Sequence, residues 1–208
     1  MGNKQELRIN TQQERASITA DIIVEAAILA LEENAGDLDK VSSQILAKKS
    51  GFSVGSLYRY FTDKEHLYSQ VWLYFIGRLH KSLVLKIDSF PANGTVRQLM
   101  MVILDHYFSD LSSRNSLRMV RIFRLCIRSL PDPENIAKPI DVLIDPLMRS
   151  QRRNQTETMR IMDENELRVI LRGALAMVRS DFLEQNPYFG TASHQKLMLD
   201  SMVRLFQR

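Results

Sequence analysis

The stretch Leu46–Leu67, LAKKSGFSVGSLYRYFTDKEHL, places two short apolar helical patterns on either side of a glycine. Gly51 can end the first helix in a left-handed conformation that other residues rarely adopt. Ser42 and Ser53 precede the two helices and can cap them through their hydroxyl groups, and Asp63 can cap a helix that follows. The stretch therefore predicts two short helices joined by a tight turn, with a longer helix directly after them.

A helix-turn-helix presents its second helix to the major groove of DNA while the first helix braces it. Leu46 supplies the packing face of the first helix, and Leu57 and Phe61 supply the inward face of the second. In a helix interior, Gly55 costs about 1 kcal/mol relative to alanine, which favours a functional reason such as close approach of DNA. The alternative is that the two helices only pack a core. The positions left for DNA are Ser53, Val54, Gly55, Ser56, Tyr58, Arg59 and Tyr60.

Charge is distributed unevenly along the chain, although the net charge is only +4. Residues 1–39 carry three basic and eight acidic side chains, a net charge of −5, whereas residues 40–64 carry a net charge of +4. A local basic excess attracts phosphates. A solvated helical face is the alternative explanation of such a lysine cluster.

The longer stretch ILAKKSGFSVGSLYRYFTDKEHLYSQV, residues 45–71, resembles the DNA-binding signature of the tetracycline-repressor (TetR) family of bacterial transcriptional regulators. The segment IIVEAAILALEENAG, residues 22–36, resembles the first helix of that family, so the resemblance covers about residues 15–75. The matching positions are Ala47, Gly51, Ser53, Gly55, Leu57, Tyr58, Tyr60, Phe61, Lys64, Glu65 and Leu67.

The resemblance implies roles for individual residues of this stretch. Tyr58 and Lys64 would hold phosphates, and Tyr60 would reach a phosphate or a base. Arg59 would contact DNA, or else point to solvent or across to the acidic first helix. Residues that would line the groove are Ser43, Gln44, Ser53, Val54, Gly55 and Ser56. Of these, Ser43 departs from the branched apolar residue that the family often has.

The rest of the chain predicts an all-α fold, because apolar residues recur at intervals of three and four and prolines are few. We expect an N-terminal three-helix helix-turn-helix DNA-binding domain over residues 1–67 and a C-terminal helical ligand-binding and dimerisation domain over residues 68–208. Residues 1–15 are expected as a flexible arm, and the first helix near Thr19. The polar run 149–158 is expected as an exposed turn or mobile loop. Later helices are expected over about 95–111, 114–129, 136–153 with interruptions at Pro139 and Pro146, 164–185 and 192–206.

The last two expected helices carry apolar stripes suited to pairing between two copies of the chain. The TetR resemblance implies a four-helix dimer interface there, and burial within one chain is the alternative. The expected interface residues are Leu167, Ile170, Leu171, Ala174, Val178, Leu197, Ser201, Met202 and Leu205.

Nine of the ten methionines lie after residue 99, accompanied by aromatic residues. Methionine adapts its shape, so these residues could wall a pocket for an apolar or aromatic small-molecule effector, or could fill an irregular core. The expected pocket residues are Trp72, Phe75, Met100, Leu104, Tyr107, Phe108, Met119, Phe123 and Met177.

Arginines recur on one face of the expected helix 114–129, at Arg114, Arg118, Arg121, Arg124 and Arg128. A solvated or salt-bridged face is the first interpretation, and an acidic partner or an anionic effector the others. Cys126 falls on the opposite, apolar side, which favours an inert core thiol over a redox sensor.

Several other classes of protein are not favoured by the sequence. The four histidines lack zinc-ligand spacing, and no phosphate loop or nucleophile elbow is present, so we expect no catalytic residues, no metal and no cofactor. The polar N-terminus, the single cysteine and the lack of a long apolar run favour a soluble cytoplasmic protein without a membrane partner.

The sequence thus predicts a ligand-responsive repressor that binds a palindromic operator in double-stranded DNA as a homodimer. The alternative is a DNA-binding interaction protein of the same fold that binds constitutively and recruits a protein partner.

Overall fold

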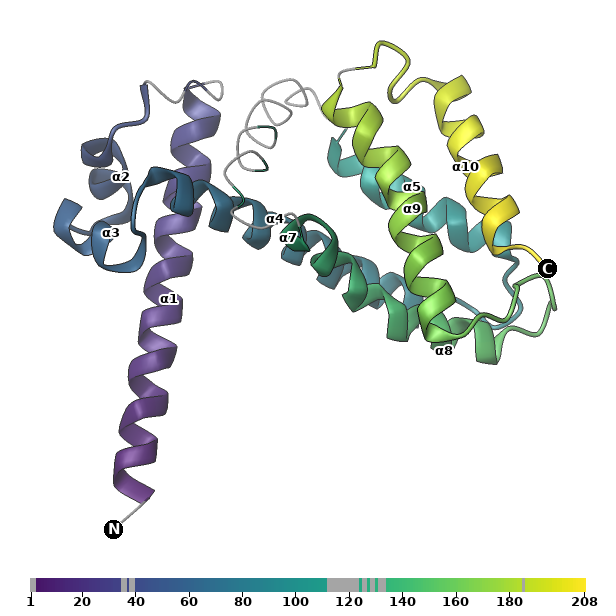
Figure 1. Ribbon diagram of the computed structural model, residues 1–208, viewed down its shortest axis with the longest axis horizontal. Helices are drawn as coiled ribbons and strands as arrows, with labels where there is room; N and C mark the ends of the chain where they lie inside the picture. The colour runs from purple at the N-terminus through teal and green to yellow at the C-terminus, as the bar shows by residue number, and fades with distance from the viewer. Residues whose placement is uncertain are drawn as a thin grey trace. The chain divides into compact units, whose positions relative to one another are not determined.

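A computed structural model of the 208-residue chain describes residues 3–34, 37, 40–111, 124, 127, 130, 134–184 and 186–208. Apart from an isolated antiparallel bridge between Met159 and Gln207, the regular structure of these residues is helical, which confirms the all-α prediction (Figure 1). No helix in this part of the chain is long and apolar enough to cross a membrane. The elements are α1 (Asn3–Glu33), α2 (Ser43–Ser50), α3 (Val54–Tyr60), α4 (Lys64–Asp88), α5 (Val96–Leu111), α7 (Glu134–Ala137), the 3-10 helix η2 (Lys138–Leu143), α8 (Ile144–Arg153), α9 (Glu164–Leu183) and α10 (Ala192–Phe206).

The chain divides into two compact units. The first contains the described residues up to Tyr74, with Ile127 and Leu130, and the second contains the other described residues from Phe75 onward. The division falls within α4. The boundary expected from the sequence, after Leu67, also falls within the first half of this helix.

Helix α1 begins at Asn3, so the prediction of a helix start near Thr19 is wrong, and residues 3–15 are helical rather than a flexible arm. The segment 3–18 contains no glycine or proline and is rich in Gln, Glu and Arg, which are good helix formers. Further along α1, Ile23, Ala27 and Leu31 are fully buried and anchor the helix in the core of the first unit.

The short helices α2 and α3 form where the caps predicted them. The Ser42 hydroxyl accepts a hydrogen bond from the Ile45 amide at 3.3 Å, and Ser53 accepts from the Ser56 amide at 3.1 Å. Gly51 has a φ of +74°, which is the left-handed C-cap conformation that glycine adopts without strain. Helix α4 is capped likewise, because the carboxylate of Asp63 accepts a hydrogen bond from the His66 amide at 2.7 Å.

In the second unit, α5 packs against α10, and α9 packs against α10, α8 and η2. The expected segment 136–153 is divided into α7, η2 and α8. Pro139 is the second residue of η2 and Pro146 lies in the first turn of α8, where a helix does not need the missing amide hydrogen. Ser150 and Gln151 are buried in α8, so the first part of the polar run 149–158 is not the exposed turn that we expected.

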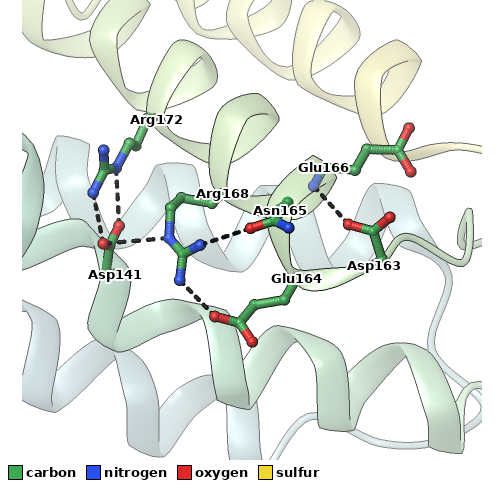
Figure 2. Close-up of polar contacts among 7 residues, drawn as sticks. All are labelled: Asp141, Asp163, Glu164, Asn165, Glu166, Arg168 and Arg172. Atoms are coloured by element: carbon green, nitrogen blue, oxygen red, sulfur yellow. Dashed lines mark hydrogen bonds and ion pairs between the residues drawn. The ribbon is translucent and has the colours of Figure 1, made fainter.

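Ion pairs join η2 to the first half of α9 (Figure 2). Asp141 accepts two hydrogen bonds from the guanidinium of Arg172, at 2.9 and 2.6 Å, and the Arg168 guanidinium lies 3.5 Å from the same carboxylate. Arg168 also donates to Glu164 at 2.5 Å. A bidentate arginine–carboxylate pair of this kind fixes orientation as well as distance, so η2 is held in register with α9.

A buried histidine links three elements of the second unit. His80 in α4 donates from Nδ1 to the carbonyl oxygen of Pro139 at 2.6 Å, so its Nε2 accepts the hydroxyl proton of Tyr107 at 2.7 Å. Burial lowers the pKa of His80 to about 4 and raises the pKa of Tyr107. The pair is therefore a neutral imidazole and a neutral phenol that tie α4 to η2 and α5.

A second histidine next to this pair has the opposite tautomer. His106 in α5 donates from Nε2 to the carbonyl oxygen of Leu79 at 2.9 Å and accepts at Nδ1 from the Lys86 ammonium at 3.0 Å. Together the two histidines attach the second half of α4 to α5 by side-chain hydrogen bonds at three points.

Candidate nucleic-acid interface

Helices α2 and α3 pack into the core of the first unit through their apolar faces. Leu46, Leu57 and Phe61 are at most 5% exposed, as the helix-turn-helix pattern predicted. Gln44 on α2 and Ser53, Gly55, Tyr58 and Arg59 on or next to α3 are exposed, and Ser43, Val54, Ser56, Tyr60 and Lys64 are half-buried. All ten predicted DNA-binding residues thus lie in the first unit and none is fully buried, while their contacts with DNA stay a prediction.

Three of these residues line one shallow hollow between α2, α3 and the start of α4, whose walls also include Asp63. The hydroxyl groups of Ser43 and Tyr58 form a hydrogen bond of 2.7 Å. The ammonium of Lys64 donates to the carbonyl oxygen of Val41 at 2.9 Å, just before α2 begins. An ammonium and two hydroxyl groups at the N-terminus of a helix are groups that bind an anionic oxygen.

Among the described side chains, Arg59 pairs with its neighbour Tyr60 and not with a residue of the acidic first helix. Its guanidinium lies over the ring of Tyr60, 5.6 Å from the centroid, and donates to the Tyr60 hydroxyl at 3.5 Å. Instead, Lys49 of α2 pairs with Glu33 of α1 at 2.6 Å. Sequence reasoning missed this pair because its residues are far apart in the chain and lysine at the end of a helix is common.

The start of α3 is occupied by its own capping bonds. Ser53 accepts the Ser56 amide, and the two serine hydroxyls are 2.9 Å apart. A Cβ atom at Gly55 would meet only the Ser53 hydroxyl, at 3.9 Å. The protein itself therefore leaves room for a side chain at position 55, and any need for glycine there comes from outside the chain.

The residues predicted for an effector pocket do not come together in one unit. Trp72 is buried in the first unit, whereas Phe75, Met100, Leu104, Tyr107, Phe108 and Met177 belong to the second, and Met119 and Phe123 lie outside the described residues. The four candidates on α5, Met100 to Phe108, are buried, and Phe108 packs against Phe189 and His194 with ring centroids 5.4 and 5.6 Å apart. The arginine face of 114–129 also lies outside the described residues except at Arg124, which is exposed.

A different hollow of about 480 Å³ opens in the second unit, next to the loop between α8 and α9. No predicted effector residue lines it. Its lining residues are Gln151, Asn154, Glu157, Met159, Arg160, Ile161 and Arg208. In the part of the chain that the structure describes, no group of three or more His, Cys, Asp or Glu side chains could hold a metal ion.

Most of the residues predicted for a dimer interface are buried inside the chain. Leu167, Leu171, Ala174, Val178 and Met202 are at most 2% exposed, because these faces of α9 and α10 pack against the rest of the second unit. They have almost no surface left to bury against a partner. Ile170 and Ser201 are half-buried, and Leu197 and Leu205 are exposed. The surface open to a partner lies on the outward faces, which also carry Val169 and Gly173.

The fold is all-helical and contains a capped helix-turn-helix. Beside this motif lie an ammonium and two hydroxyl groups of the kind that bind phosphate. These features define the class of DNA-binding proteins. Residues 23–71 match the sequence model of the family described as bacterial regulatory proteins, tetR family. The matched residues lie in the first unit and include α2 and α3, which confirms the resemblance to the TetR family found in the sequence. No sequence among the curated proteins matches the chain significantly.

Solved structures with the same fold extend over almost the whole chain. A TetR transcriptional regulator from Rhodococcus sp. RHA1 is 18% identical with a TM-score of 0.62, and the match covers 91% of this chain and 95% of that one. A TetR-family regulator from Marinobacter aquaeolei VT8 is 17% identical with a TM-score of 0.54, over 95% and 98% of the two chains. The regulator FadR from Bacillus subtilis, solved in complex with stearoyl-CoA, is 16% identical with a TM-score of 0.60, over 88% and 96%.

Proposed function

We propose that this DNA-binding regulator is a ligand-responsive repressor that binds a palindromic operator as a homodimer. The observation that carries the proposal is the arrangement around the hollow of the first unit. There, Ser43, Tyr58 and Lys64 meet at the N-terminus of α2, beside the exposed residues of α3. Phosphate contacts from this hollow would set the register of α3 in the major groove.

A dimer follows from the size of the recognition helix. Helix α3 has seven residues and offers few side chains to base edges, so a specific site needs two such helices. The outward faces of α9 and α10 are the proposed contact between the two copies. Val169 of α9 is 73% exposed and Leu197 of α10 is 61% exposed. Gly173, four residues after Val169 on α9, is exposed with open space at its Cβ position, which allows close approach of a partner helix. The two recognition helices would then lie about one helical turn of DNA, roughly 34 Å, or more apart.

The effector would be an apolar or aromatic organic molecule bound in the second unit. The support is the concentration of methionine, with nine of the ten methionines after residue 99, and the complex of a protein of the same fold with stearoyl-CoA. An effector that alters the spacing of two recognition helices needs a differential affinity worth about 1–3 kcal/mol, or about a 5- to 150-fold change in operator affinity.

The proposal is tested by selecting bound duplexes from a random library with the wild-type chain. We expect an inverted repeat to be enriched. Lys64→Ala should weaken binding uniformly across sequences and reduce the salt dependence by about one phosphate contact, because it removes one cation from the hollow. Lys81→Ala removes an exposed charge from the second unit and is the matched control, with unchanged binding.

The effector is then sought with the enriched duplex as a probe, among aromatic compounds, fatty acids and acyl thioesters. An at least fivefold shift in operator affinity by one class would support the ligand response. Failure to enrich an inverted repeat at moderate salt would refute the dimeric operator model. An enriched repeat whose affinity no compound shifts would favour constitutive binding.

A further inference from the structure

We infer that Ser43 is a positioning residue that orients the hydroxyl group of Tyr58 toward a phosphate of the DNA backbone. The inference rests on the proposed DNA binding by α2 and α3 and assigns a role to a residue that departs from the usual pattern of the family.

The two hydroxyl groups come from different helices. Ser43 is the first residue of α2, and Tyr58 lies in the last turns of α3. Their oxygen atoms are 2.7 Å apart, the usual length of an O–H···O hydrogen bond. This side-chain bond therefore holds the phenol of Tyr58 at a fixed position relative to the N-terminus of α2.

Counting protons shows what the pair can present to a ligand. Two hydroxyl groups carry two protons, and their mutual bond uses one, so one O–H remains for an outside acceptor. Tyr58 is 49% exposed, Ser43 is half-buried, and the hydrogen bond between them is exposed, so an outside acceptor can reach the pair. A phenol is more acidic than an aliphatic alcohol and donates more strongly to an anion. The favoured arrangement in a complex is Ser43 donating to Tyr58, and Tyr58 donating to the phosphate.

The surroundings select an anion for this last bond. Lys64 lines the same hollow and has two N–H donors left after its bond to the Val41 carbonyl. The first turn of α2 adds amide groups that have no acceptor within the helix. A hydrogen bond accepted from Ser43 polarises the Tyr58 hydroxyl and strengthens its donation. Ser43 thus acts on the phosphate through Tyr58.

This role predicts a specific pattern of operator affinities. Ser43→Ala should weaken binding roughly three- to tenfold, because the phenol loses the bond that orients it. Ser43→Thr keeps the hydroxyl group and should bind within about twofold of wild type, whereas Ser43→Val is similar in shape and should bind like Ser43→Ala. In a Tyr58→Phe background, Ser43→Ala should cause no further loss of operator affinity, because no hydroxyl group remains at position 58 for Ser43 to orient.

The experiment measures operator affinity by fluorescence anisotropy at several salt concentrations, for wild type, the three Ser43 variants, Tyr58→Phe and the double variant. The salt slope should be unchanged in Ser43→Ala, because no cation is lost. Helix content and melting temperature, measured by circular dichroism, verify that each variant is folded. If Ser43→Ala proves less stable, the comparison of the affinities of Ser43→Thr and Ser43→Val still tests the role of the hydroxyl group.

Two outcomes separate the inference from the proposed function. If the wild-type chain binds no duplex, the proposed function fails and the inference fails with it. If the wild-type chain binds an inverted repeat but Ser43→Ala binds equally well, or if the loss is the same with and without the Tyr58 hydroxyl, only the inference is overturned.

Discussion

Lowering the pH from 7 to 5 should destabilise the second unit through His80. This imidazole is 1% exposed, and its burial lowers the pKa to about 4 from the ordinary value of 6.5. In the unfolded chain the same group takes up a proton near pH 6.5, so below that pH the unfolded state binds more protons than the folded state. The free energy of unfolding should therefore fall as pH falls from 6.5 toward 4, and should be constant with respect to this group above 6.5.

The size of the effect follows from the two pKa values. Each unit of pKa difference corresponds to about 1.4 kcal/mol. The full difference in the pKa of His80 corresponds to about 3 kcal/mol, of which about 2 kcal/mol is lost by pH 5. This is a large share of the stability of an ordinary domain, about 5–15 kcal/mol. Measuring at pH 5 and above avoids most of the titration of carboxylates.

The assay is urea unfolding followed by circular dichroism between pH 5 and 8, together with an NMR titration of the four histidine rings. His80→Gln removes the titrating ring and keeps an amide donor, so its unfolding free energy should lose this pH dependence even if it is lower throughout. A histidine resonance that titrates well below the others identifies the buried ring. The reasoning is refuted if all four rings titrate near 6.5, or if wild type and His80→Gln change equally with pH.

Three further predictions concern other parts of the molecule. Gly55→Ala should raise the free energy of unfolding by up to about 1 kcal/mol and weaken operator binding, measured by urea unfolding and anisotropy; unchanged DNA affinity would contradict a close approach of DNA at this position. Gly94→Ala should lower stability by roughly 1–3 kcal/mol, because the new Cβ would lie 2.5 Å from Cε1 of the buried Phe90 ring, and a melting temperature equal to wild type would disprove this clash. If the chain forms the proposed dimer, Val169→Arg should convert it to a monomer in analytical ultracentrifugation. Leu85→Arg, at a similarly exposed leucine of α4, should leave it dimeric. An unchanged dimer in both variants would exclude the outward face of α9 as the interface.

The local parts of the fold could be predicted from the sequence, because caps and turns depend on neighbouring residues. Ser42, Gly51, Ser53 and Asp63 cap or end their helices where the pattern placed them. The start of α1 was missed, since Thr19 is a good cap and nothing in a local pattern shows that helix-forming residues before it continue the helix.

The candidate site could be predicted only as a set of residues. The bonds of Ser43 to Tyr58 and of Lys64 to the Val41 carbonyl join positions 15 and 23 residues apart, which periodicity does not specify. The apolar stripe of α9 illustrates the same point. Periodicity identifies Leu167 and Leu171 as a buried face, but whether the covering surface belongs to the same chain or to a partner depends on tertiary packing.

Trp72 is an intrinsic fluorescence probe of the first unit. It is the only tryptophan of the chain, and it is buried in the first unit, whereas helices of both units contribute to circular dichroism. Tryptophan emission during unfolding should therefore follow the DNA-binding unit alone. Comparing the emission curve with the dichroism curve on unmodified protein would separate the stabilities of the two units, and a shift of only one curve on adding a compound would show which unit binds it.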